Sequence, residues 1–219
     1  MQALRARLVA AALLAVAYVA LTMAIAGGEF NTLDRQVLQA MSSVWSEPLH
    51  PLFQAIAELG GLELTTILMI GLAVFLFRRG FGADAWAVLA FVAAQGLEVL
   101  YKANLQHLGP PRSVSHADGP SITELVSQSG PLANSFPSGH MVRAVIAYGL
   151  IAFVVNRLAP WPLARALAFP IATAIIVLLA FDRLYLDVHW ESDVLGGLLL
   201  GAIGLIAGTV WLDRPVAGR

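Results

Sequence analysis

The chain has 219 residues, of which 58% are hydrophobic and only 12% are Asp, Glu, Lys or Arg. With a mean hydropathy of +0.76, this composition is too apolar for a soluble domain and indicates an integral membrane protein. A net charge of -1 provides no basic surface for nucleic acid, and the lack of cysteine excludes disulfides and thiolate metal sites.

The first predicted membrane span covers residues 8–26 and follows Arg5 and Arg7. A spanning helix needs about 20 mainly apolar residues. The triplet Ala24-Ile25-Ala26 resembles a signal-peptide cleavage site, so a cleaved signal peptide is the alternative. The apolar run exceeds the usual length of about 7 to 15 residues in signal peptides, which favours retention as a membrane anchor.

A more polar stretch, residues 27–61, follows this span. Its apolar residues at the spacing of one helix face are Leu33, Val37, Leu38 and Met41. This pattern predicts an amphipathic helix that lies at the membrane surface or packs on the bundle.

Five further spans complete a predicted all-α bundle of six transmembrane helices, which forms one integral membrane domain over residues 1–219. Their approximate bounds are 62–77, 83–105, 138–155, 163–185 and 188–211, with an earlier start within residues 52–59 as the alternative for the first of these. Residues 106–136 form a long loop rich in Pro, Ser and Gly, with a possible short helix over 121–129. Loops of this length are usually functional or disordered.

The basic residues predict the orientation. If the N-terminus is cytoplasmic, eight of the thirteen Lys and Arg residues lie on the cytoplasmic side. The others are Arg35, Lys102, Arg112, Arg143 and Arg183, and four of these lie at or next to the outer ends of spans three to six. We therefore expect a bacterial inner-membrane protein whose functional face, including the long loop, is periplasmic.

The segment Phe136-Pro137-Ser138-Gly139-His140 closes the long loop and opens the fourth span. Backbone N–H groups without partners and the positive end of the helix dipole make such a helix start suited to phosphate. In the alternative interpretation Ser138 is an ordinary N-cap and His140 is an interfacial residue without a chemical role.

A second polar cluster, residues 181–193, lies between the last two apolar runs. His189 and Asp193 are four residues apart, so on a helix they share a face and Asp193 accepts the N–H of one imidazole nitrogen. The other nitrogen is then free to attack. A merely stabilising pair at the interface is an equally supported interpretation of this spacing.

Three cations join these groups on the predicted external face. Lys102, Arg112 and Arg183 match a phosphomonoester in charge and in the number of acceptor oxygens. The same cations would repel a divalent ion, and no His-Glu-x-x-His pattern is present. A metal site is therefore the weaker interpretation.

These motifs resemble those of the type 2 phosphatidic acid phosphatase superfamily, which comprises integral membrane lipid phosphatases. The family motifs are a Lys and an Arg-Pro six residues apart, then Pro-Ser-Gly-His, then Ser-Arg, five residues, His, three residues and Asp. Residues 137–140 match the second motif, and Arg183, His189 and Asp193 match the third. The resemblance spans roughly residues 83–208.

The chain departs from the family pattern in two places. Nine residues separate Lys102 from Arg112, and Ser113 stands where the family has proline. Asp182 replaces the serine before Arg183, where its carboxylate can hold the guanidinium while weakening its charge toward phosphate.

The resemblance implies a phosphohistidine mechanism without a metal or another cofactor. In it His189 would be the nucleophile, Asp193 would orient it, and His140 would protonate the leaving group and later assist water. The residues that would hold the equatorial phosphoryl oxygens are Lys102, Arg112, Ser138, Gly139 and Arg183.

Other polar residues receive supporting interpretations. Glu98 is expected to pair with the lysine one turn later, either to position its amine or as a purely structural pair. Arg143 shares a helix face with His140 and either touches a substrate headgroup or snorkels to the interface. His107 and His116 are expected to be solvated loop residues.

The sequence thus predicts a phosphatase that acts on the monophosphate or diphosphate of a phospholipid or a polyprenyl lipid such as undecaprenyl diphosphate. A site at the helix ends admits a headgroup while the lipid tail stays in the bilayer. One alternative is a lipid phosphotransferase with the same histidines, and another is a non-catalytic protein that binds or transports phospholipid. The sequence does not specify the lipid or the oligomeric state.

Overall fold

The structure is a computed structural model that describes residues 2–111, 113–117 and 134–214. Six helical stretches within these residues are long and apolar enough to cross a membrane. They are Gln2–Ala26, Glu47–Arg78, Asp84–Asn104, Gly139–Leu158, Pro162–Tyr185 and Glu191–Leu212. The predicted all-α architecture with six spans is confirmed.

Two of these spans are composite. The second consists of the short helix η1 (Glu47–Leu49), α3 (His50–Glu58) and α4 (Leu62–Arg78), so it begins well before the predicted start at residue 62. The third consists of η2 (Asp84–Val88) and α5 (Leu89–Asn104). The chain turns between α3 and α4 at Gly60 and Gly61, and this turn later contacts the candidate site.

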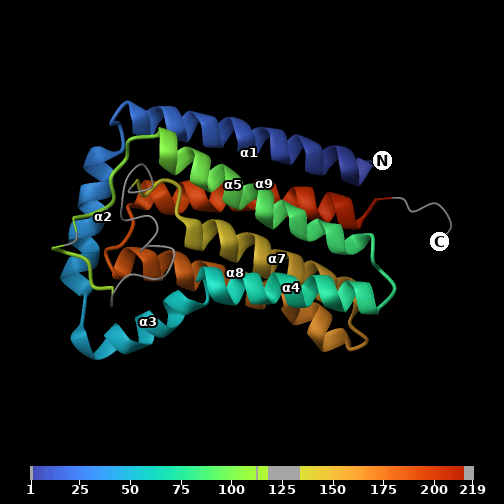
Figure 1. The fold of residues 1–219 in the computed structure, drawn as a ribbon. Coiled ribbons are helices and arrows are strands. Elements are labelled where there is room, and N and C mark those ends of the chain that lie inside the picture. Colours follow the sequence, from blue (N-terminus) through green and yellow to red (C-terminus); the bar gives the residue numbers. More distant parts are fainter. Residues whose placement is uncertain (1, 112, 118–133, 215–219) are drawn as a thin grey trace.

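Helix α7 (Gly139–Leu158) is the centre of the bundle (Figure 1). It packs against α8 (Pro162–Tyr185), α9 (Glu191–Leu212), α5 and α4, while α1 (Gln2–Ala26) packs on the outside of α9. Most side chains of α7 are therefore buried against neighbouring helices, and nearly all of these are apolar. Since lipid is as apolar as these side chains, contact packing rather than removal from water holds the helices together.

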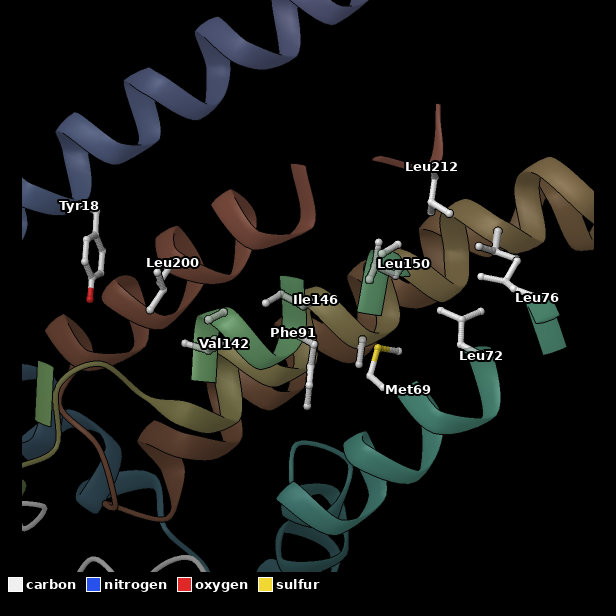
Figure 2. Packing of buried hydrophobic residues seen from close by; sticks show 14 of the residues in the cluster. Tyr18, Met69, Leu72, Leu76, Phe91, Val142, Ile146, Leu150, Leu200 and Leu212 are labelled. Atoms are coloured by element: carbon white, nitrogen blue, oxygen red, sulfur yellow. The ribbon is translucent and has the colours of Figure 1, made fainter. Parts of the chain in front are cut away.

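Figure 2 shows this packing from close by. Met69 and Leu72 of α4 and Ile146 and Leu150 of α7 belong to one buried cluster. Tyr18 of α1 joins the same cluster near α9, and its ring stacks 5.7 Å from the ring of buried Phe136, three residues before the start of α7. The core thus connects the outermost span to the segment that opens α7.

The predicted amphipathic helix is α2 (Asn31–Val44), which lies across one end of the bundle (Figure 1). Asp34 is only 3% exposed and accepts hydrogen bonds from the Ser192 N–H at 3.0 Å and the Ser192 hydroxyl at 2.9 Å. On the same helix, the Ser42 hydroxyl donates to Asp187 at 2.8 Å. Of the two predicted positions for this helix, packing on the bundle is therefore the one observed.

The opposite end of the bundle carries a set of ion pairs. Arg7 at the start of α1 lies 2.6 Å from Asp213 after α9, and Asp84 lies 3.1 Å from Arg214 and 3.8 Å from Arg157. These arginines are among those predicted to face the cytoplasm. The start of α1 and the end of α9 lie together at this end, away from α2 (Figure 1).

Helix α9 lies very close to the start of α7 at Gly197. A Cβ atom added there would lie 2.6 Å from the backbone oxygen of Ser138 and 2.6 Å from the Cβ of Met141. Both are rigid parts of α7 or its cap. Only glycine therefore lets the start of α9 rest directly on the start of α7.

We expect Gly197→Ala to destabilise the protein by roughly 1–3 kcal/mol, because the added methyl must displace backbone. A lower melting temperature of the purified protein in detergent measures this. Gly96→Ala in α5 is the matched control, since a Cβ there meets nothing within 4 Å, and should not lower the melting temperature. Equal melting temperatures for Gly197→Ala and wild type would contradict the close approach.

Candidate active site

The candidate site lies at the end of the bundle that α2 crosses (Figure 1). The C-terminal turns of α5 and α8 and the N-terminal turns of α7 and α9 all reach this end. These are the elements that carry the predicted site residues. Arg112 and the possible helix over 121–129 lie outside the described residues.

His140 stands in the first turn of α7, where several charged groups meet. Arg183 of α8, Arg143 of α7, His189 before α9 and Lys102 of α5 all lie close enough for their charges to act on its imidazole. Residues from remote stretches of the chain therefore converge around one histidine. Such a set of cations is suited to a phosphate group.

His189 and Asp193 form the predicted pair, although by a different route. Asp193 Oδ2 lies 3.2 Å from His189 Nδ1 and accepts the backbone N–H of Trp190 at 3.0 Å. The expectation of a shared helix face is wrong, because α9 begins at Glu191 and His189 precedes it. The Asp193 carboxylate, in the first turn of α9, reaches back to the residues before the helix. Since Nδ1 of His189 faces this carboxylate, Nε2 is the ring nitrogen that does not face it.

Arg183 is held by the residue before it. Its Nε donates to Asp182 Oδ2 at 2.8 Å, and Nη2 donates to the same oxygen. Both side chains are buried. The ion pair expected from the sequence is present, and it fixes the guanidinium while leaving Nη1 outside the pair.

Glu98 joins two cations of the site. Its carboxylate lies 2.9 Å from Lys102 Nζ and 3.7 Å from Arg143 Nη1. The pair with Lys102 is the expected one. The contact with Arg143 was not predicted, and it links α5 to α7 beside the candidate phosphate site.

Arg143 does not snorkel to the interface, because its side chain is only 3% exposed. Its Nε donates to the Gly60 carbonyl at 3.1 Å, and Nη2 lies 3.4 Å from His140 Nδ1. A guanidinium only donates, so Nδ1 of His140 is the acceptor and the proton of the neutral ring is on Nε2. Arg143 therefore orients His140 and supports the site.

The Ser138-Gly139 step explains why glycine precedes His140. A Cβ on Gly139 would lie 2.8 Å from Arg143 Nη1 and still closer to the Glu98 carboxylate. The Ser138 N–H donates to the Asp193 carbonyl at 3.0 Å, which ties the second motif to the third. The buried Ser138 hydroxyl has no hydrogen-bond partner among the described residues.

The prediction that both loop histidines are solvated is wrong for His107 and only partly right for His116, whose side chain is 26% exposed. His107 Nε2 lies 3.4 Å from Asp193 Oδ1 with its side chain 11% exposed. The ring of His116 stacks on Trp45 at 4.1 Å, and its Nδ1 lies 3.3 Å from a buried carboxylate, that of Asp187. No spacing rule pointed to these contacts, because they arise only when the loop folds back over α2 and α9.

A cavity of about 710 Å³ lies between α2 and the loop. The residues that line it are Asn31, Asp34, Arg35, Gln106, His107, Leu108, Gly109, Pro111, Asn134 and Trp190. His140, Arg183 and Lys102 are not among them, so this cavity is distinct from the cluster around His140. His107 connects the two, since it lines the cavity and contacts Asp193.

The described residues contain no group of three or more His, Asp or Glu that could hold a metal ion.

A family model described as the PAP2 superfamily matches residues 83–216, which is more than half of the chain and includes every motif discussed above. The chain belongs to the PAP2 superfamily. It is a membrane lipid phosphatase, as the motif resemblance implied.

Known proteins resemble this PAP2 chain over most of its length. Phosphatidylglycerophosphatase B of Bacillus subtilis is 29% identical over 85% of this chain and 86% of its own. The Escherichia coli protein named putative undecaprenyl-diphosphatase YbjG is 31% identical over 68% of this chain and 69% of its own.

A solved structure shares the fold. The crystal structure of a transmembrane PAP2-type phosphatidylglycerolphosphate phosphatase from Bacillus subtilis superposes with a TM-score of 0.80. It covers 95% of this chain and 98% of that one at 24% sequence identity. The arrangement of six membrane helices is therefore that of a known PAP2 protein.

The environment of His107 predicts a pH-dependent stability. Burial by itself would lower the pKa of His107, but the hydrogen bond and charge of Asp193 and the charge of Asp34 outweigh it and raise that pKa. The folded protein then holds a proton that the unfolded chain has lost. This stabilisation is complete below about pH 6.5 and is lost as the pH rises through the raised pKa.

We therefore expect the melting temperature of the wild type to fall more steeply over that pH window than the melting temperature of His107→Ala. Thermal unfolding in detergent at a series of pH values above about 6.5 measures the difference. Parallel curves for the two proteins would show that His107 is not coupled to Asp193 in the folded state.

Proposed function

We propose that this PAP2 phosphatase removes the terminal phosphate of a lipid phosphate or diphosphate at the periplasmic face of a bacterial inner membrane, through a phosphohistidine on His189. The observation that carries the proposal is the convergence of two histidines and several cations from separate spans on one end of the bundle. The arginines in the ion pairs at the other end support a cytoplasmic position for the start of α1 and the end of α9.

The position of the site supports a lipid substrate. A headgroup can reach the helix ends while its acyl or prenyl chain stays beside the lipid-facing side chains of the spans. The two relatives are named for phosphatidylglycerophosphate and undecaprenyl diphosphate, which both carry a terminal phosphate on a membrane lipid. We propose a substrate of this class.

In the first step His189 Nε2 attacks the phosphorus atom in line with the bond to the lipid. Asp193 accepts the Nδ1–H of the same ring and stabilises the positive charge that develops on it. The negative charge of the bound phosphate stabilises His140 as an imidazolium, in which Nδ1 carries a proton and no longer accepts from Arg143. As the phosphorus–oxygen bond breaks, this imidazolium gives its Nε2 proton to the departing oxygen and becomes a neutral imidazole. The departing group leaves as the lipid alcohol or lipid monophosphate. The phosphoryl group is now on His189.

The charge of the transferring phosphoryl group is stabilised by fixed donors. Lys102 and Arg183 are held in place by carboxylates before the substrate arrives, so their reorganisation in the reaction is small. The Gly139 N–H at the start of α7 and the Ser138 hydroxyl, which lacks another partner, are further donors. By family resemblance Arg112 completes this set.

In the second step water attacks the phosphohistidine. His140, now a neutral imidazole, takes a proton from the water as the phosphorus–nitrogen bond breaks. Inorganic phosphate leaves, and both histidines return to their starting protonation states. The scheme contains no step that needs a metal ion.

We expect the purified protein to release phosphate from phosphatidylglycerophosphate or undecaprenyl diphosphate, and much less from a soluble phosphate ester. With water as the only acceptor, release distinguishes hydrolysis from phosphoryl transfer to a second lipid. Chelator should leave the rate unchanged, and vanadate, which mimics pentacoordinate phosphorus, should abolish it. Loss of activity with chelator would contradict the metal-free scheme.

His189→Ala should abolish turnover while the protein is still expressed and purifies as a folded protein. The substitution removes the nucleophile, which lies in the segment between α8 and α9 and outside both helices. Turnover retained by this variant would remove His189 from the proposed role.

A further inference from the structure

Each oxygen of the Asp193 carboxylate faces a different imidazole. Oδ2 lies 3.2 Å from His189 Nδ1, whereas Oδ1 lies 3.4 Å from His107 Nε2. Neither Oδ1 nor His107 Nε2 has a hydrogen-bond partner among the described residues. The carboxylate is fully buried, so each of these two atoms is the partner available to the other.

His107 is held firmly at its backbone. Its N–H donates to Asn134 Oδ1 at 3.0 Å, and its carbonyl accepts the Ser135 N–H at 2.8 Å and the Ser135 hydroxyl at 3.1 Å. The Asn134 side chain in turn donates to the Lys102 carbonyl at 2.7 Å. His107 is thereby fixed to both the end of α5 and the segment that leads into α7.

The ring of His107 is also packed. It stands edge-on to Phe136, with ring centroids 6.4 Å apart and an interplanar angle of 89°. Phe136 is fully buried, directly before the Pro-Ser-Gly-His motif. A histidine mounted in this way is part of the structure around the candidate site rather than a solvated loop residue.

We propose that His107 is a positioning residue, which binds the second oxygen of Asp193 and thereby fixes this carboxylate against the nucleophile His189. The proposal rests on the proposed function, because His107 acts only through that nucleophile. His107 has no contact with the reacting phosphoryl group in this role.

The charges around His107 give the proposal a measurable consequence. The groups that face His107 are Asp193 from α9 and, across the cavity, Asp34 and Arg35 from α2. A protonated His107 shares the negative charge of Asp193, and its place in the cavity wall allows proton exchange with water. His189 faces Asp193, and the charge of His189 also acts on His140.

Removal of His107 leaves the whole charge of Asp193 acting on His189. Protonated His189 is then more stable, and the nucleophile becomes unprotonated only at higher pH. The acid limb of the pH dependence of kcat/KM should therefore move to higher pH, and the NMR titration of the His189 imidazole should move in the same direction.

The experiment compares wild type, His107→Ala and His107→Gln in detergent, with both measurements on each protein. For His107→Ala we expect kcat to fall by about tenfold, with little change in KM. A loss of this size is usual when a residue that orients a functional side chain by a hydrogen bond is removed. A glutamine can still donate an N–H to Asp193 Oδ1 but carries no charge. His107→Gln should therefore recover most of kcat while both titrations stay shifted.

His116→Ala is the matched control, because His116 is a histidine of the same loop that also faces a buried carboxylate, that of Asp187. It should move neither the acid limb nor the His189 titration. If His107→Ala does not fold, His107→Gln decides. Unshifted titrations in His107→Gln would overturn the proposal.

The NMR readout does not depend on turnover, which separates this proposal from the proposed function. A wild-type protein that releases no lipid phosphate, with a His189 titration that moves in His107→Gln, would refute the proposed function and leave the coupling of His107 to His189 in place. An active enzyme with an unmoved titration would refute only the role of His107.

Discussion

The candidate site depends on the direct contact between the starts of α7 and α9. The Ser138 N–H donates to the Asp193 carbonyl at 3.0 Å, and Gly197 leaves no room for even a methyl group against the Ser138 carbonyl. This contact sets the positions of the two motifs that carry the histidines. Because the motifs are about 50 residues apart in the sequence, only a tight and specific helix packing can hold them in one geometry.

Paired charges make the cationic site compatible with its surroundings. Glu98 lies between Lys102 and Arg143, and Asp182 holds Arg183. An unpaired charge at this depth would cost several kcal/mol, and removal of one partner from a buried pair is strongly destabilising. The carboxylates therefore serve two purposes, since they offset the cost of burial and fix the direction in which each cation points before a phosphate is bound.

The sequence was sufficient for the spans and for much of the site, because hydropathy, the Pro-Ser-Gly-His segment and the pair of His189 with Asp193 are local patterns. What it missed depends on the fold of the chain in three dimensions. The sequence predicts a solvated His107, because only a loop that folds back brings this residue to Asp193. It predicts that Arg143 touches a headgroup or lies at the interface, because helix periodicity does not reveal the turn at Gly60. The sequence predicts helix α2 but not the buried contact of Asp34 with α9. A polar residue of an amphipathic helix ordinarily faces water, so nothing in the pattern indicates this contact.

The central claim, that phosphate passes through a covalent bond to His189, is tested most directly by trapping that bond. Purified protein is mixed with its lipid substrate, quenched within milliseconds under alkaline conditions that preserve phosphohistidine, and digested for mass spectrometry. With a lipid diphosphate as substrate, whose lipid monophosphate leaving group can depart without a proton, a His140→Ala variant is slowed mainly in the water attack and should accumulate the intermediate. The account predicts phosphate on His189 in both proteins, at a higher level in the variant. Phosphate on another residue, or turnover with no phosphorylated protein at any time, would contradict it.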